Sequence, residues 1–260
     1  MDRLMFLDGV NLMAQPVIQR KLANVQVKEF YHDLFVDTQV KHFELMCTPF
    51  VKAGAGRVVD VGGGCGFFAA AVTGLLGIPT RVIDLDDTSI EQCKKLGIEA
   101  IQSDALQPPV FGDERVVCFN LILHHLVGPT EKSTAQLQGT ALEAWRNQPV
   151  HLFVNEYIYD SYISNLSGKL IYVITSSRIL SSVGNLVARI IPSLKANTFG
   201  VGVRFRATAE WLDFFESRGW RVIAHTRGEE EFVSKARRLL FIKSCRRDSF
   251  VLQAKDMAHS

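Results

Sequence analysis

Short apolar runs alternate with segments of helical length through the middle of the chain, between residues 57 and 157. This alternation is typical of strand–helix units that build a parallel sheet. Strands are predicted at residues 57–61, 80–85, 99–103, 116–123 and 150–157, with helices at 67–76, 90–96 and 131–145 between them. A helix at 207–218 and two strands at 220–225 and 249–254 follow later in the chain. The pattern predicts an α/β fold whose mostly parallel sheet has helices on both faces.

Two regions outside this alternation have other patterns. Residues 1–55 place apolar side chains at helical spacing, with Pro16 and Pro49 as expected breaks, and predict an N-terminal helical cap. Residues 56–260 then form the main domain. Within it, residues 160–205 are apolar but interrupted by glycines and a proline, so we expect helices and loops inserted after the fifth strand. Such an insertion can act as a lid over a pocket.

Four glycines, Gly62, Gly63, Gly64 and Gly66, stand between the first predicted strand and its helix. Glycine lets the backbone turn sharply and approach a ligand without a Cβ atom in the way. The dinucleotide pattern Gly-x-Gly-x-x-Gly/Ala would begin at Gly62, but its last position is Phe67, where a small residue is needed for close packing and access to a diphosphate. This residue disfavours a nicotinamide oxidoreductase.

The segment does fit Asp-x-Gly-x-Gly-x-Gly, with Asp60 followed by Gly62, Gly64 and Gly66, and in this it resembles the class I methyltransferase family. The resemblance runs from the first predicted strand to the last. It implies a Rossmann-like, seven-stranded sheet with a final antiparallel strand, and S-adenosylmethionine as cofactor. In that family the loop, here including Gly63, holds the amino-acid part of the cofactor. A carboxylate at Asp60 suits the positive ammonium and sulfonium groups, whereas it would repel a diphosphate.

Acidic residues also follow the second and third predicted strands. The resemblance places Asp84, with the neighbouring Leu85, at the ribose of the cofactor, where a carboxylate can accept hydrogen bonds from both hydroxyls. It likewise places Asp104 and Ala105 at the amino group of the adenine. Asp87 is expected to cap the helix after the second strand. Acids at the carboxyl ends of three successive strands are a strong indication, because open α/β sheets bind ligands at this edge.

The fourth predicted strand leads into Asn120, where many relatives have an acid, and then into Leu-His-His-Leu. The backbone of Asn120 can still contact the cofactor. The histidine segment resembles the Leu-His-Asp-Trp segment of small-molecule O-methyltransferases, in which the histidine deprotonates the substrate hydroxyl. On this match His124 is the base and His125 replaces the aspartate. In many other methyltransferases, however, His-His-Leu packs against the cofactor, and both interpretations stay open.

Other side chains near the predicted pocket also have two interpretations. Glu156 ends the fifth predicted strand, where an acid in the family orients the catalytic histidine; a solvated acid at a strand end is the alternative. Four tyrosines in or beside the insertion either line a substrate site or form ordinary core. They are Tyr157, Tyr159, Tyr162 and Tyr172. Basic side chains gather at residues 237–247, and we expect them on the solvated face of a helix and at the start of the last strand.

Composition narrows the partners and the compartment. With 29 basic and 27 acidic residues, the net charge of +2 is far from the strongly basic balance of a nucleic-acid-binding protein. Five scattered cysteines without a Cys-x-x-Cys pair indicate neither a disulfide framework nor a zinc site, so we expect no metal and a cytoplasmic location. The most apolar stretch, residues 169–191, is interrupted by Arg178 and two serines and falls short of the ~20 apolar residues of a membrane span.

The sequence thus predicts an S-adenosylmethionine-dependent methyltransferase that acts on a small-molecule acceptor, most readily on oxygen with a histidine taking the proton. N-methylation of a small metabolite is one alternative. A methyltransferase-like protein that binds the cofactor without transferring its methyl group is another. A homodimer is compatible with the sequence.

Overall fold

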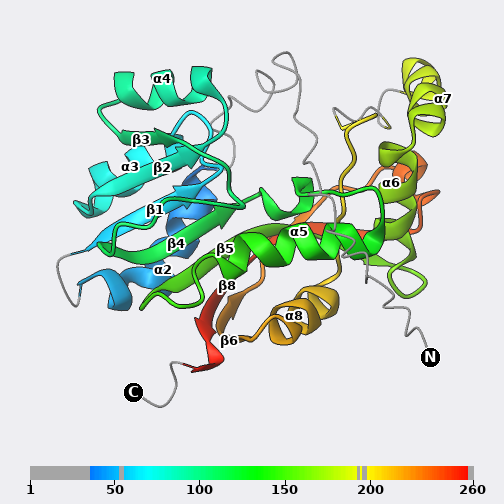
Figure 1. Ribbon diagram of the computed structural model, residues 1–260. Coiled ribbons are helices and arrows are strands. Elements are labelled where there is room, and N and C mark those ends of the chain that lie inside the picture. Colours follow the sequence, from blue (N-terminus) through cyan, green and yellow to red (C-terminus); the bar gives the residue numbers. More distant parts are fainter. Residues whose placement is uncertain (1–35, 53–55, 192–193, 195–197, 257–260) are drawn as a thin grey trace, which may run out of the picture.

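The computed structural model describes residues 36–52, 56–191, 194 and 198–256 (Figure 1). Its strands are β1 (Arg57–Val61), β2 (Thr80–Asp84), β3 (Glu99–Gln102), β4 (Glu114–Asn120), β5 (His151–Ser161), β6 (Trp220–Thr226), β7 (Glu230–Glu231) and β8 (Ile242–Ala254). Its helices are α2 (Val36–Lys52), α3 (Phe67–Leu76), α4 (Asp87–Lys95), the 3-10 helix η2 (Leu123–His125), α5 (Glu131–Glu143), α6 (Leu166–Ser176), α7 (Arg178–Ile190), α8 (Thr208–Ser217) and α9 (Lys235–Arg238).

The strands form one sheet in the order β3-β2-β1-β4-β5-β8-β6, and the short β7 pairs with β8. The first five strands are mutually parallel, and β8 runs antiparallel between β5 and β6. The central strands are buried at consecutive positions, because helices cover both faces of a parallel sheet. The predicted α/β fold with a mostly parallel sheet and a final antiparallel strand is confirmed.

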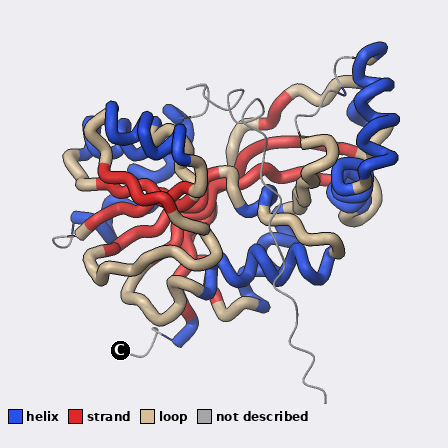
Figure 2. The backbone as a smooth tube through the Cα atoms, turned by 45° about the horizontal axis from the view of Figure 1, so that its top comes forward, coloured by secondary structure: helices blue, strands red, loops and turns tan. Residues whose placement is uncertain are grey.

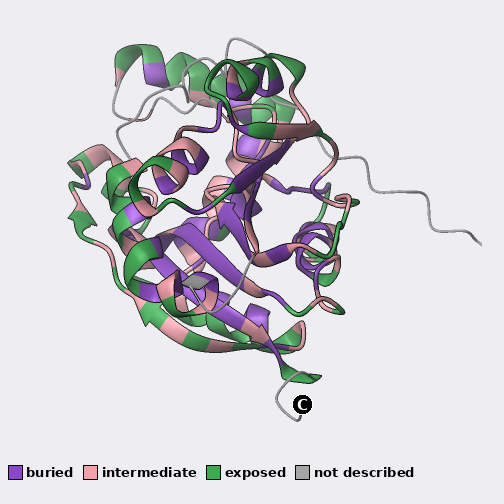
Figure 3. Cartoon of the chain, turned by 90° about the vertical axis from the view of Figure 1, so that its left-hand side faces the viewer, coloured by how far each residue is buried: buried purple, intermediate pink, exposed green. Residues whose placement is uncertain are grey.

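Two apolar clusters lie on opposite faces of the sheet. Trp145, just after α5, and Trp211 on α8 belong to the cluster on one face. Phe43 on α2 and Phe68 on α3 pack edge to face on the other, where Phe153 of β5 joins them. Figure 2 shows the strands running between these helical layers, and Figure 3 shows that the buried residues concentrate on the strands.

The predicted N-terminal cap is described only in part. Residues 1–35, with Pro16, and residues 53–55 lie outside the described residues, and the boundary of the cap at residue 55 stays a prediction. Pro49 was expected to break a helix, but it lies inside α2. Proline there removes one N–H donor close to the end of the helix, and the carbonyl left without that donor is on the exposed Leu45, where water can bind it.

The fifth and last strands are longer than the pattern predicts. β5 continues to Ser161 and β8 begins at Ile242, and their pairing continues beyond the end of β4. The sequence pattern ended both strands early because their outer halves are rich in polar residues. Those residues pair with one another instead of facing water, and the two strands form a ribbon that reaches α6 and α7 at the far end of the molecule from α3 and α4 (Figure 1).

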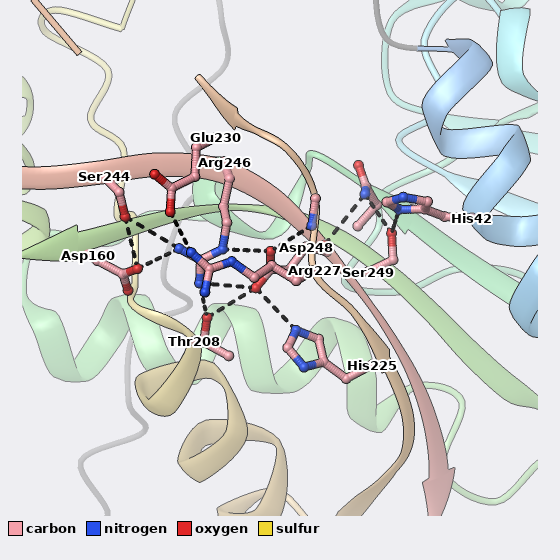
Figure 4. Close-up of polar contacts among 12 residues, drawn as sticks. His42, Asp160, Thr208, His225, Arg227, Glu230, Ser244, Arg246, Asp248 and Ser249 are labelled. Carbon is pink, nitrogen blue, oxygen red and sulfur yellow. Dashed lines mark hydrogen bonds and ion pairs between the residues drawn. The ribbon is translucent and has the colours of Figure 1, made fainter. Parts of the chain in front are cut away.

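A buried ionic cluster stabilises this ribbon against α8 (Figure 4). The Arg246 guanidinium is within 2.5 Å of an Asp160 oxygen and 2.9 Å of an Asp248 oxygen. Asp248 also accepts a hydrogen bond from the Thr208 hydroxyl at 3.1 Å and lies 3.1 Å from His225 Nε2. The expectation that the basic run is solvated is therefore wrong for Arg246, which is 3% exposed, because two carboxylates replace the water around its charge.

The insertion after β5 contains α6 and α7, and its role as a lid stays a prediction. Among the described residues, no single helix is long and apolar enough to cross a membrane; α6 and α7 pass that test of length and composition only as a pair, and they are bent by 100° at the break between them.

All five cysteines are described, all are buried, and none forms a disulfide. Burial raises the pKa of the Cys93 and Cys245 thiols to about 12 each. It also raises the pKa of Cys47 and Cys118 well above that of an ordinary thiol. At these four positions a thiolate, the reactive form of cysteine, is therefore rare at neutral pH.

Candidate functional site

The glycine loop follows β1 and is tied to the neighbouring strand. The Gly62 N–H donates a hydrogen bond to the Ile83 carbonyl of β2 at 2.7 Å. A Cβ atom on Gly63 would collide with the Asp60 carboxylate. Gly64 has a φ of +53°, and a Cβ atom built there would meet nothing within 4 Å. The backbone at Gly64 therefore borders open space, as a loop that holds a ligand requires.

Asp60 ends β1 as a buried carboxylate with little compensation. It is 1% exposed, and one oxygen accepts a hydrogen bond from the Asn120 amide nitrogen at 2.9 Å. Burial raises the pKa of Asp60 to about 7, the hydrogen bond from Asn120 opposes this rise, and the Asp84 charge adds to it. The oxygen of the Asn120 amide is itself buried without a hydrogen-bond partner. The pair thus offers a carboxylate and an acceptor to a group that carries positive charge and N–H donors.

Asp84, at the end of β2, is held against the same loop. Its carboxylate accepts hydrogen bonds from the backbone N–H groups of Gly64 and Asp86, each at 2.9 Å. Burial raises its pKa, although both hydrogen bonds lower it. The prediction that Asp87 caps α4 is wrong: Asp86 is the cap, with its carboxylate accepting from Ser89 N at 2.8 Å. The helix begins at Asp87, three residues earlier than the pattern indicated, and Asp86 has the extended backbone of an N-cap.

The remaining predicted cofactor residues lie farther along the same sheet edge. Leu85 follows Asp84 directly, and parallel pairing aligns Asp84 with Gln102, so the loop after β3 starts at the same level. On that loop, Asp104 accepts a hydrogen bond from Leu106 N at 2.9 Å, and Ala105 is buried. Hydrogen bonds join Asp60 to Asn120 and Gly64 to Asp84 along this sheet edge, whereas Asp104 lies on the separate loop after β3.

A strained turn after β4 carries the two histidines. Leu121 has a φ of +56°, which for a residue with a side chain is unfavourable by about 1–2 kcal/mol, and its N–H donates to the Asn155 carbonyl at 2.8 Å. η2 follows at once. Backbone strain of this kind persists where surrounding contacts enforce it and is frequent at functional sites.

The strained turn presents His124 to Glu156. Glu156 is fully buried, and one of its oxygens lies 2.5 Å from His124 Nδ1 while the other accepts from Leu123 N at 2.6 Å. Since a carboxylate accepts, Nδ1 carries the proton of the neutral imidazole, and Nε2 keeps a lone pair. Sequence reasoning proposed Glu156 either as an orienting acid or as a solvated one, and it is not solvated.

Two buried polar residues continue this network. The Gln138 amide of α5 donates to the Leu123 carbonyl at 2.8 Å, and its oxygen accepts from the Arg206 guanidinium at 2.6 Å. Burial lowers the pKa of Arg206 to about 10, so it stays cationic at neutral pH. Neither residue was predicted, because no motif distinguishes a glutamine in the middle of a helix or an arginine in a loop.

Aromatic rings surround His124. The rings of His125, Phe205 and Tyr157 lie 4.1, 5.0 and 6.0 Å from it, measured between centroids. Tyr159 stacks on Phe205 at 4.2 Å. Burial raises the pKa of Tyr157 to about 12, and burial together with the nearby His124 lowers the pKa of His125 well below its ordinary value. At neutral pH the Tyr157 hydroxyl keeps its proton, and His125 is uncharged.

The other two tyrosines of the insertion are not part of this group. Tyr172 is buried on α6, and its hydroxyl donates to the Gly128 carbonyl at 2.9 Å, whereas Tyr162 is 54% exposed. Phe205, which sequence reasoning missed, takes their place beside the histidine. Within the described part of the chain, no group of three or more His, Cys, Asp or Glu side chains is arranged to hold a metal ion.

Comparison with known proteins was made by sequence and by structure. No family model and no curated sequence matches the chain. An S-adenosylmethionine-dependent methyltransferase from Leishmania major matches with a TM-score of 0.53 and 14% identity, over 87% of this chain and 76% of its own. Another from Thiobacillus denitrificans, in complex with S-adenosyl-L-homocysteine, matches with a TM-score of 0.51 and 16% identity, over 88% of this chain and 97% of its own. This chain has the Rossmann-like methyltransferase fold.

The same fold is found in an enzyme named for another activity. The (4+2)-cyclase SpnF matches with a TM-score of 0.53 and 12% identity, over 83% of this chain and 81% of its own. At these identities the likeness concerns the methyltransferase fold alone. The reaction has to be argued from the side chains of the site.

Proposed function

We propose that this protein is an S-adenosylmethionine-dependent methyltransferase that methylates an oxygen of a small molecule, with His124 as general base. The observation that carries the proposal is the His124–Glu156 pair, in which a carboxylate 2.5 Å away orients a buried imidazole. The turn that carries His124 directly follows Asn120, which is hydrogen-bonded to Asp60. The two similar structures of S-adenosylmethionine-dependent methyltransferases support the choice of cofactor.

The glycine loop and its acids have the chemistry to hold this cofactor. Asp60 and the unpartnered amide oxygen of Asn120 suit its ammonium group, and the glycine loop of Gly62, Gly63 and Gly64, whose backbone borders open space at Gly64, suits its amino-acid part. Asp84 and Leu85 would hold the ribose, with Asp104 and Ala105 at the adenine. Bound S-adenosylmethionine would supply an electrophilic methyl group on a positively charged sulfur.

His124 provides the matching base. Its Nε2 lone pair would take the proton of the acceptor hydroxyl while an oxygen electron pair forms the bond to the methyl carbon and the carbon–sulfur bond breaks. The products are a methylated oxygen, S-adenosylhomocysteine and a protonated imidazole. Glu156 stabilises that imidazolium, because its carboxylate holds the Nδ1 proton. The Gln138 amide acts as a positioning group, since it fixes the Leu123 backbone between the two residues.

The surroundings of His124 favour an apolar or aromatic acceptor. Rings of Tyr157 and Phe205 stand within about 6 Å of the imidazole and offer flat surfaces to a planar alcohol. His125 is uncharged at neutral pH and adds a further flat ring. A small molecule held by these rings beside the base would gain most of its rate from proximity and alignment.

The first experiment measures cofactor binding. Calorimetry with S-adenosylmethionine, S-adenosylhomocysteine and NAD should give binding of the first two only, and failure of both to bind would refute the proposal. The second uses methyl-labelled S-adenosylmethionine with a panel of small phenols, alcohols and amines. Label in the amines alone would favour the N-methyltransferase alternative and remove the need for His124 as a base.

SpnF is named as a cyclase and not as a methyltransferase, and this favours a second candidate function: a protein that binds the cofactor without transferring its methyl group. The two differ in what His124 does. If no acceptor in an extract of small metabolites becomes labelled while S-adenosylhomocysteine binds tightly, the protein uses this fold for another purpose. Labelling that is lost in His124→Asn but kept in the exposed-residue variant Asp213→Asn supports transfer.

A further inference from the structure

Helix α7 presents its apolar side chains to solvent. Ile179, Val183, Leu186 and Ile190 are 77%, 54%, 59% and 79% exposed. At 3.6 residues per turn, these four positions fall within an arc of about 60° on one side of the helix. Leu180 and Val187 widen the same side. We call this surface, made of the six residues, the α7 stripe. Scattered exposed apolar residues are ordinary, but a continuous stripe marks an interaction surface.

The opposite side of α7, which faces the protein, is built from small residues. The Ser181 hydroxyl donates to the Ile174 and Thr175 carbonyls at 2.8 and 3.1 Å, and Phe199 packs where a Cβ on Gly184 would be. Ala188 is buried on the same side. The helix therefore reaches its packed position through small side chains, and its large apolar residues are left for something outside the described chain.

The polar flank of α7 is basic. Arg178 and Arg189 are exposed and lie about 60–80° around the helix from Leu186 at the edge of the α7 stripe, with Ser182 on the near side of them and Asn185 on the far side. No aspartate or glutamate occurs from residue 161 to residue 209; within that stretch Arg204 and Arg206 are buried, so Arg178 and Arg189 are the exposed charges of α7. An apolar stripe flanked by arginines and free of nearby acids in sequence is the pattern of a helix that lies flat in the headgroup region of an anionic membrane.

We propose that α7 docks this protein on a membrane surface that contains anionic lipids. The α7 stripe enters the boundary between headgroups and acyl chains, while Arg178 and Arg189 extend to lipid phosphates. This position needs no spanning helix, and it leaves the site at Asp60 in water, because α3 and α4 lie at the other end of the molecule from α7 (Figure 1). The proposal does not depend on the reaction at His124.

Charge favours an anionic membrane over two other partners for the α7 stripe, a second copy of this chain and the first 35 residues of the chain itself. A second copy placed stripe to stripe would bring the same acid-free, basic stretches together, which is unfavourable. The first 35 residues of this chain contain four basic and four acidic residues, so they offer no excess of negative charge to Arg178 and Arg189. An anionic lipid surface supplies both an apolar layer for the α7 stripe and negative charge for the arginines.

The test is sedimentation of the full chain with vesicles of phosphatidylcholine alone, or of phosphatidylcholine with about a third phosphatidylglycerol. We expect binding to the anionic vesicles and little to the neutral ones. The Ile179→Ser/Ile190→Ser double variant should bind about tenfold or more weakly, because two large apolar side chains leave the lipid boundary. Arg178→Gln/Arg189→Gln should weaken binding by about fivefold per charge, and high salt should do the same to the native protein.

Leu75→Ser is the matched control, since Leu75 is 74% exposed on α3, away from the α7 stripe. It should bind vesicles as the native protein does. All variants should keep the native melting temperature. Equal binding to neutral and anionic vesicles, no binding, or unchanged binding of the isoleucine variant would overturn the proposal. A dimer in solution that this variant dissolves, or a lower melting temperature of the variant, would assign the α7 stripe to a second copy or to this chain itself, and would overturn it too.

Discussion

Replacing Asp60 by asparagine should stabilise the protein at alkaline pH while removing its affinity for the cofactor. The carboxyl is buried, and its pKa in the folded state is about 7 against an ordinary value of 3.8. The pKa of Asp60 is higher in the folded than in the unfolded protein, so between about pH 4 and pH 7 the folded protein holds a proton that the unfolded chain has lost. The free energy of unfolding therefore falls as pH rises through this range. A rise of roughly three pKa units corresponds to about 4 kcal/mol of unfolding free energy lost by pH 8.

Asparagine removes that charge but buries an extra N–H₂ group. If the new donor finds no acceptor, it offsets about 1–3 kcal/mol of the gain. The net expectation is a ligand-free Asp60→Asn protein that is about 1–3 kcal/mol more stable than the native protein at pH 8. At pH 5, where the native carboxyl is already neutral, the variant should be no more stable. The test is the change in the stability gain of Asp60→Asn between pH 5 and pH 8, since this change reports the ionisation of the Asp60 carboxyl.

Urea unfolding at pH 5 and pH 8, without cofactor, measures both quantities, and calorimetry with S-adenosylhomocysteine at pH 8 measures binding. Asp213→Asn, an exposed change of the same chemistry on α8, is the control and should alter neither. In the native protein, affinity should decrease as pH falls below 7, because the protonated carboxyl no longer attracts the ammonium group. A stability difference between Asp60→Asn and native protein that is the same at both pH values would refute the assigned cost of the buried charge.

Three further predictions concern the base, the ionic cluster and the loop. His124→Asn should lower labelled-methyl transfer by about 10²–10⁴-fold and leave S-adenosylhomocysteine binding within a few fold, whereas Glu156→Gln should lower transfer less; equal loss of binding would mean a structural role. Asp248→Asn should lower the urea-unfolding free energy by about 3–5 kcal/mol, since Arg246 loses a buried partner, and an unchanged midpoint would contradict this. Gly64→Ala should reduce stability by only about 1–2 kcal/mol, from its φ of +53°, yet weaken cofactor binding more than tenfold in calorimetry, because the new Cβ enters open space beside the loop.

The regular part of the fold was predictable from the sequence because short apolar runs, which become buried strands, alternate with segments of helical length. Strands β1, β2, β4 and the inner part of β5 are largely apolar and buried on both faces, and the bounds of the first five strands agree with the predicted ones to within a few residues, except at the outer end of β5. The ribbon of β5 and β8 was not predictable. The charges of Asp160 and Arg246 argue against a buried strand until they are seen to form an ion pair, and that pair joins positions far apart in the chain.

The candidate site divides in the same way. Asp60, Asp84 and the glycine loop were found because a local motif has to shape one tight turn. The residues that surround the histidine turn lie on other elements. Gln138 on α5 bonds the Leu123 carbonyl and Phe205 before α8 contacts the His124 ring, and both arrive there only through the packing of the whole domain. A sequence alone contains no local signal for such residues, whereas their burial and hydrogen bonds identify them at once.

The buried thiols make this protein a convenient subject for site-specific labelling. A single cysteine placed on the surface, for example at Ile179 or Leu186, would ionise readily and react with a maleimide dye, while the five native thiols would stay protected as long as the chain is folded. A polarity-sensitive dye on α7 would then report contact with lipid directly, without prior removal of any native cysteine. The same protection makes the number of reacting thiols a simple measure of how much of a sample has unfolded.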